Sequence, residues 1–156
     1  MADTEFIIEP GRQDIVIKHT FDAPPETVFK VMTDPELIPK WWGPRDLTTI
    51  VDKMDVRPGG QWRFVHREDN GSEYGFHGVY HDTVPGQRVV QTTEFEGAPG
   101  EVALETMTFE GAGGKTKVVA RALYPSVESR DAVIQAGMES GARETYERID
   151  ELLNTL

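Results

Sequence analysis

The sequence contains no cysteine, so a disulfide, a thiolate nucleophile and a cysteine-based metal site are all excluded. It also has no apolar run near the ~20 residues that a membrane-spanning helix needs. The first residues, Met1 to Glu5, lack the basic and then apolar pattern of a signal peptide. From these absences we expect a soluble, cytoplasmic protein.

Basic residues are scarce as well. The chain has 16 Lys and Arg residues against 27 Asp and Glu residues, and its formal net charge is −11. A nucleic-acid surface needs a basic face, and so does docking on anionic lipid. We therefore expect neither a nucleic-acid partner nor a membrane partner. The 156 residues are enough for a single sizeable core.

Hydrophobic periodicity predicts the order of the elements. Residues 14–21 alternate as a half-buried strand, and short helices are expected at Glu26–Met32 and Glu36–Trp41, on either side of Pro35. From Leu47 the period changes to two, and glycine, proline and asparagine mark the turns between strands. The strands predicted there lie at about 47–56, 60–67, 73–83, 87–95, 102–110 and 116–124.

The last predicted element is one long amphipathic helix over Val127–Leu153, which contains no proline. The expected fold is therefore α+β: a curved antiparallel sheet of about seven strands grips this C-terminal helix, and two short helices lie between the first and second strands. We expect one domain over residues 14–156, with residues 1–13 as an N-terminal extension.

Four motifs give the chain a family resemblance. They are Phe21-Asp22-Ala23-Pro24, Thr33-Asp34-Pro35, Trp41-Trp42-Gly43-Pro44 and Asp55-Val56-Arg57-Pro58-Gly59-Gly60-Gln61-Trp62-Arg63-Phe64. With the order of elements over residues 14–153, they resemble the family named for the C-terminal domain of the activator of the heat-shock-protein-90 ATPase. That family belongs to the START-like, or SRPBCC, superfamily with the helix-grip fold. The resemblance implies this fold; superfamily relatives bind lipids, steroids, polyketides or hormones, and some are cyclases or aromatases.

A sheet curved around one helix leaves a gap in which a ligand would lie. Strand parity and the helix pattern place large aromatic and small polar side chains around this gap. The predicted pocket residues are His19, Trp41, Trp62, Phe64, His66, Phe76, Tyr80, Gln91, Thr93, Phe95, Met107, Phe109, Met138 and Gly141.

Glycine in the C-terminal helix needs a reason, because it costs ~1 kcal/mol relative to alanine inside a helix. Gly137 and Gly141 lie four residues apart, hence on one face. They indicate either close packing of the helix on the sheet or a cavity. We expect a cavity, whose floor lies under Trp62, Gln91 and Thr93.

Candidate chemistry is sparse. His77 and His81 are four residues apart on one strand, ~13 Å, which is too far to hold one ion, so no metal is expected. His19 and His66 face inward, where a hydrogen-bonded structural role is favoured over catalysis. Asp82 could serve as a polar pocket group. No catalytic residue and no cofactor is assigned.

The sequence leaves three functions open. The first is a protein that binds a hydrophobic or amphipathic small molecule, as a monomer or homodimer. The second is a cyclase, aromatase or hydrolase-type enzyme in which His19, His66, Asp82 or a tyrosine meet in the same pocket. The third is an interaction module that contacts the chaperone for which the family is named.

Overall fold

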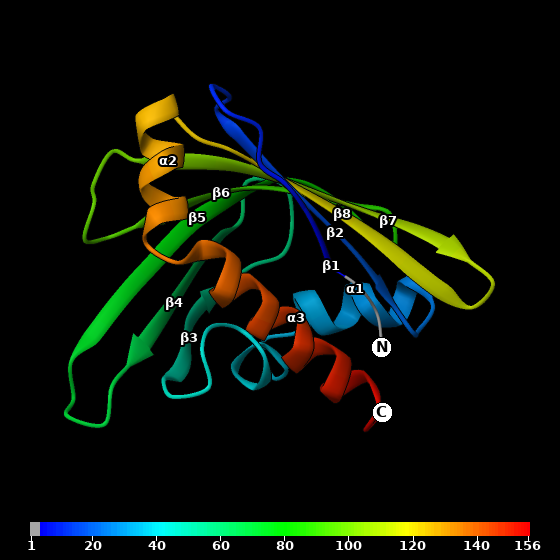
Figure 1. The fold of residues 1–156 in the computed structure, drawn as a ribbon. Coiled ribbons are helices and arrows are strands. Elements are labelled where there is room, and N and C mark those ends of the chain that lie inside the picture. The colour runs from blue at the N-terminus through cyan, green and yellow to red at the C-terminus, as the bar shows by residue number, and fades with distance from the viewer. Residues whose placement is uncertain (1–3) are drawn as a thin grey trace.

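The computed structural model describes residues 4–156, and within this range one antiparallel sheet of eight strands dominates the fold (Figure 1). The strand order is β1-β2-β8-β7-β6-β5-β4-β3. The strands are β1 (Thr4–Ile7), β2 (Asp14–Phe21), β3 (Thr48–Met54), β4 (Gln61–Arg67), β5 (Glu73–Val84), β6 (Arg88–Phe95), β7 (Val102–Ala112) and β8 (Lys115–Leu123).

The helices are gathered on one side of this sheet, which curves over them in Figure 1. They are α1 (Pro25–Thr33), the 3-10 turn η1 (Ile38–Lys40), α2 (Val127–Gln135) and α3 (Met138–Leu153). The predicted α+β helix-grip fold is confirmed. None of the helices in the described range is long and apolar enough to cross a membrane.

All seven predicted strands are present, and β1 is an eighth. It lies in the segment that the sequence indicated as an N-terminal extension, and it pairs antiparallel with β2, with Thr4 opposite His19 and Ile7 opposite Val16. The ring of Phe6 on β1 also lies 4.6 Å below the guanidinium of Arg143 on α3. Strand β1 therefore extends the sheet and contacts the C-terminal helix.

The prediction of one continuous C-terminal helix was wrong. Helix α2 ends at Gln135 and α3 begins at Met138, with Gly137 between them at φ 95°. This left-handed conformation is costly for any residue with a Cβ, so glycine marks the break. The predicted second short helix is also smaller than expected, since only Ile38–Lys40 forms a 3-10 turn.

Helix α1 and the residues after it close one end of the core. Pro25 occupies the first turn of α1, where its missing N–H costs nothing, and the helix ends before Pro35. The indole Nε1 of Trp41 donates a hydrogen bond of 2.8 Å to the carbonyl of Val31. This bond fixes the segment that follows η1 against α1.

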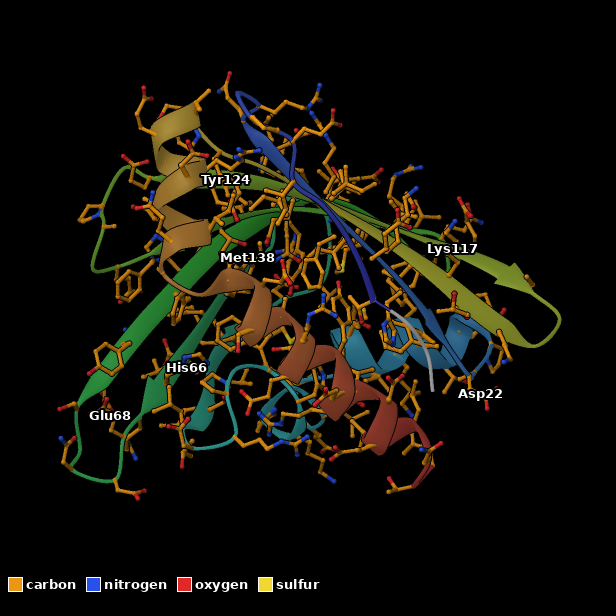
Figure 2. All side chains as sticks on the ribbon, viewed as in Figure 1. Asp22, His66, Glu68, Lys117, Tyr124 and Met138 are labelled. Carbon is orange, nitrogen blue, oxygen red and sulfur yellow. The ribbon has the colours of Figure 1, made fainter. Side chains whose placement is uncertain are left out.

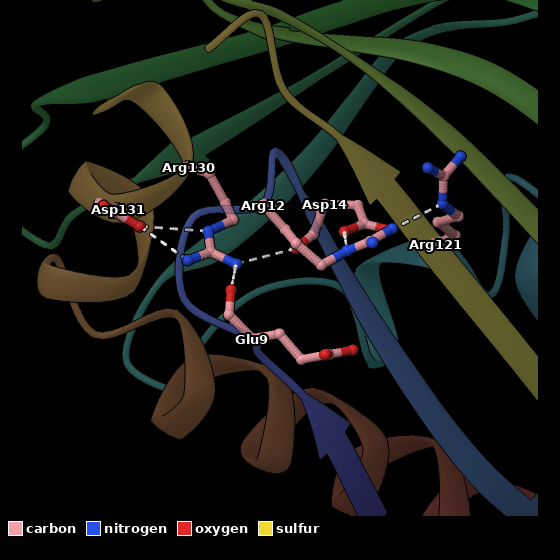
Figure 3. A network of polar contacts seen from close by, with 6 residues as sticks. All are labelled: Glu9, Arg12, Asp14, Arg121, Arg130 and Asp131. Atoms are coloured by element: carbon pink, nitrogen blue, oxygen red, sulfur yellow. Dashed lines mark hydrogen bonds and ion pairs between the residues drawn. The ribbon is translucent and has the colours of Figure 1, made fainter. Parts of the chain in front are cut away.

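A buried arginine attaches α2 to the N-terminal part of the sheet (Figure 3). Arg130 is only 3% exposed, and its Nη1 donates to the carbonyls of Glu9, at 2.6 Å, and Asp14, at 3.3 Å. The Asp14 carboxylate in turn accepts from Arg12 and Arg121. The Arg12 guanidinium, and Arg121 with it, holds the pKa of Asp14 well below its usual range despite the burial.

Candidate functional site

Two adjoining cavities lie on the side of the sheet that the helices cover. The α3 cavity, of about 350 Å³, lies between the sheet and the first half of α3. The α2 cavity, of about 660 Å³, lies between α2 and the ends of β6 and β7. Glu105 and Tyr124 line both of them. Figure 2 shows Tyr124 near α2 and Met138 at the start of α3. These shared walls make the two cavities neighbouring compartments of one site.

Aromatic side chains form much of the wall of the α3 cavity. Six of them line it: Trp41, Trp42, Phe64, Tyr80, Tyr124 and Tyr146. They come from the segment after η1, from β4 and β5, from the residue that follows β8 and from α3. Segments far apart in the sequence therefore contribute to one apolar enclosure.

The structure distributes the fourteen predicted pocket residues over three places. Those lining the α3 cavity are Trp41, Phe64, Tyr80, Gln91, Met107, Met138 and Gly141. Those lining the α2 cavity are Phe76, Thr93 and Phe95. Those lining neither are His19, Trp62, His66 and Phe109.

Three of these last four residues are packed in the core. The ring of Phe109 meets that of Phe29 on α1 at a centroid distance of 5.4 Å, and Trp62 is 2% exposed. His19 is stacked on Tyr146 at 5.1 Å, and its Nε2 lies 3.0 Å from a carboxylate oxygen of Asp150. They share the inward face with the cavity residues, but other side chains cover them.

His66 is also buried, between the rings of Trp42 and Phe76 at 4.7 and 5.1 Å. Among the described residues its Nε2 has no hydrogen-bond partner. Burial lowers the pKa of His66, and the nearby charge of Arg148 lowers it further. The neutral form of this imidazole is therefore favoured in the folded protein.

The two glycines of the C-terminal segment have different surroundings. Gly137 terminates a helix rather than lying inside one. Gly141 lies in α3 and lines the α3 cavity, and a Cβ placed on it would meet no neighbouring heavy atom within 4 Å. The predicted floor is only partly assembled, because Gln91 lines this cavity, Thr93 lines the other and Trp62 lines neither.

Glu105 is the principal polar residue that sequence reasoning missed. It belongs to the same strand face as Ala103, Met107 and Phe109, so strand parity already placed it inward. Glu105 accepts a hydrogen bond from Thr93 Oγ1 and lies opposite Gln91 in the β6–β7 ladder. Burial raises the pKa of the Glu105 carboxyl, and the bond from Thr93 opposes this only in part.

Two tyrosines beside Glu105 were missed as well. Burial raises the pKa of Tyr124 to about 12, and the neighbouring Glu105 adds to the effect. The same two causes raise the pKa of Tyr146. Tyr146, Ile149 and Leu153 form the buried stripe of α3, at the helical spacing of three and four residues, and that spacing could have identified Tyr146.

Of the residues named for a catalytic alternative, His19 and Asp82 lie outside the two cavities. His19 pairs with Asp150, and neither residue lines the α2 or the α3 cavity. Asp82 pairs with Arg88 at 2.7 Å on the outside of the sheet, and it too lies outside both cavities. Within residues 4–156, no group of three or more His, Asp or Glu side chains is arranged to hold a metal ion.

Solved structures share this fold over almost the whole chain. A protein from Rhodobacter sphaeroides is 24% identical, with a TM-score of 0.90 and coverage of 99% of this chain and 100% of that one. Protein Ms6760 from Mycobacterium smegmatis is 23% identical, with a TM-score of 0.86 and coverage of 98% and 97%. An Arthrobacter aurescens protein is 22% identical, with a TM-score of 0.89 and coverage of 97% and 92%. No curated protein matches this chain significantly in sequence.

The family comparison agrees with the motifs and with the fold. Residues 22–154 match the family described as activator of Hsp90 ATPase homolog 1-like protein. The matched segment runs from the end of β2 to the end of α3 and includes nearly all residues that line the two cavities. The chain thus belongs to the family of activator of Hsp90 ATPase homolog 1-like proteins, with the START-like helix-grip fold.

Proposed function

We propose that this protein binds a hydrophobic or amphipathic small molecule in the joined α3 and α2 cavities. The observation that carries the proposal is the pair of adjoining cavities, of about 350 and 660 Å³, beneath one sheet. Small-molecule sites are typically apolar concavities of a few hundred Å³ with few polar groups, and both cavities fit that description. The binding takes place in the cytoplasm, and the ligand enters a site that the fold already provides.

The apolar walls contribute a large part of the binding free energy without any covalent chemistry. Burial of about 300 Å² of apolar ligand surface, at ~25 cal/mol per Å², contributes roughly 7 kcal/mol before the costs of association. A micromolar dissociation constant corresponds to about 8 kcal/mol. Polar groups such as Gln91 and Thr93 then orient a ligand that carries a polar substituent.

A ligand screen on wild type and two leucine variants tests the proposal. Fatty acids, fatty amines, flavonoids and polyketides are screened by thermal shift and native mass spectrometry. Gly141→Leu places a side chain in the α3 cavity, whereas Ser140→Leu adds the same side chain one residue away, at a position that lines neither cavity. We expect a stabilising ligand for wild type and for Ser140→Leu, and weakened binding by Gly141→Leu. Failure of every compound to bind wild type, or equal binding by all three proteins, would contradict the proposal.

The description of the family favours a second candidate, contact with the Hsp90 chaperone. Purified chaperone is mixed with this protein, and ATP hydrolysis is measured against the amount added. A dose-dependent rise in the chaperone's ATPase rate supports contact, and an unchanged rate in the presence of a large excess counts against it.

A further inference from the structure

Glu105 and Tyr124 line both cavities, and Glu105 is the acidic residue of this pair. Among residues 4–156 its carboxyl has one side-chain hydrogen bond, from Thr93 Oγ1, and no ion pair. The Glu105 side chain is half-buried, and a carboxylate partly screened from water in this way is normally paired with a cation or fully hydrogen-bonded. One carboxyl oxygen of Glu105 therefore remains available to a group that enters the cavities.

The side chains facing Glu105 carry no positive charge that could pair with it. Beside it lie Tyr124, just after β8, and Tyr146 on α3; both phenols are neutral at ordinary pH, and burial raises their pKa values further. Gln91 and Thr93 on β6 are uncharged, and Tyr80 on β5 is buried and neutral.

The charged residues further out do not neutralise it either. Arg121 lines the α3 cavity, but its Nε is bonded to Asp14 at 2.9 Å and its side chain is 47% exposed. Glu101 and Glu128 line the α2 cavity and carry the same sign as an ionised Glu105. The charges around the two cavities therefore favour a positively charged ligand.

The aromatic wall of the α3 cavity also favours a positively charged ligand. Trp41, Trp42 and Phe64 line the α3 cavity together with the three tyrosines named above. The faces of such rings attract cations, and the effect grows where water is excluded. The net charge of −11 adds a long-range attraction for cations.

We propose that the ligand of this site is a lipophilic monocation, an aromatic or aliphatic molecule with one protonated amine, and that Glu105 is its anchor. The inference rests on the proposed function and names the ligand class of the same site. The ammonium group donates to the free Glu105 carboxylate oxygen while the apolar part occupies the aromatic compartment. A hydroxyl in the same place gains one hydrogen bond but leaves the half-buried carboxylate without a counter-charge.

Three probes of one shape separate charge from hydrophobicity: 1-naphthylmethylamine, 1-naphthalenemethanol and 1-naphthoic acid. Their affinities at pH 7.5 are measured by calorimetry for wild type, Glu105→Gln and Glu110→Gln. The two variants remove one charge each from β7, but Glu110 is exposed and lines neither cavity. We expect the amine to bind wild type at least tenfold tighter than the alcohol, with the acid weakest.

Glu105→Gln should weaken amine binding at least tenfold and change alcohol binding less than threefold, and Glu110→Gln should change neither. Amine affinity for wild type should also rise between pH 4.5 and 8 as Glu105 ionises, and this rise should be absent in Glu105→Gln. Equal affinity of amine and alcohol for wild type, or amine binding that survives Glu105→Gln, would overturn the inference. In that case alcohol binding still supports the proposed function, whereas failure of all three probes and of the ligand screen removes both.

Discussion

Gly43 and His66 are so closely packed that a methyl group on the glycine would overlap the imidazole Nε2. Gly43 also has φ 87°, a conformation that L side chains rarely adopt. Two costs therefore combine at one position: backbone strain and collision with a buried ring. Trp42 and Phe76 hold that ring on either side, so it has little freedom to move.

The comparison of Gly43→Ala with Gly86→Ala isolates the collision. Gly86 has φ 72°, but nothing lies within 4 Å of a Cβ placed there. We expect Gly86→Ala to lower the free energy of unfolding by about 1–2 kcal/mol through strain alone. Gly43→Ala should cost a further 1–3 kcal/mol through overpacking. Urea denaturation measures both, and equal losses would mean that His66 moves aside freely.

Glu105 gives a pH-dependent contribution to stability. Burial raises its pKa in the folded state, so the folded protein binds this proton more tightly than the unfolded chain. Stability from this group is fully present below the unfolded pKa and is lost as the pH rises through the folded pKa, by about 1.4 kcal/mol per unit of difference. We expect Glu105→Gln to be more stable than wild type at pH 8 and to gain less, or nothing, at pH 4.5.

Urea denaturation between pH 4.5 and 8 tests this expectation, with Glu110→Gln as the control for removal of one negative charge. A gain for Glu105→Gln that does not change with pH would show that Glu105 carries no raised pKa in the fold.

Replacement by alanine should have opposite effects on stability at Gly137 and at Gly141. Alanine at Gly137 must adopt φ 95°, which costs about 1–2 kcal/mol, whereas alanine at Gly141 meets open space inside a helix and gains about 1 kcal/mol. Thermal unfolding of Gly137→Ala and Gly141→Ala should therefore shift in opposite directions. Stabilisation by both substitutions would indicate one continuous helix in solution.

Sequence periodicity predicted the central elements well because their signals are local. A period of two runs through residues 47–124, and Asn70-Gly71 is a typical hairpin turn. Strand β1 was missed because four residues are too few to establish a period, and only its pairing with β2 defines it. The helix break at Gly137 was missed because a glycine can either interrupt a helix or be tolerated within it.

Strand parity predicted which strand residues face the helices, but not which of these residues line a cavity. Parity turns Met107 and Phe109 to the same face, but α1 covers Phe109 while Met107 lines the α3 cavity. Which inward residues border empty space depends on where the helices rest, and that is a tertiary property. Glu105 was overlooked because carboxylates usually face solvent, although its parity is that of Met107.

At the scale of the whole molecule, Arg130 joins α2 to the N-terminal strands. Replacement by methionine keeps the apolar stem but removes the donors to the carbonyls of Glu9 and Asp14. A buried acceptor left without a partner costs about 1–3 kcal/mol. We expect Arg130→Met to destabilise the protein by an amount in this range and to speed hydrogen exchange in α2.

Arg67→Met is the matched control, because Arg67 is half exposed and its ion pair with Glu73 lies at the surface. It should change stability by less than about 1 kcal/mol. Hydrogen exchange that is unchanged in α2 of Arg130→Met would show that the helix is held by its apolar contacts alone.

The attachment of α2 has a consequence for any attempt to trim this protein to its family boundaries. The family match begins at residue 22, after β1, β2 and both carbonyls that accept from Arg130. A fragment cut there would expose the edge of β8 where β2 now pairs, and an unpaired edge strand invites aggregation. It would also remove the two carbonyl groups to which the Arg130 guanidinium donates. Residues 4–21 cover this edge of the sheet, and a soluble fragment has to retain them.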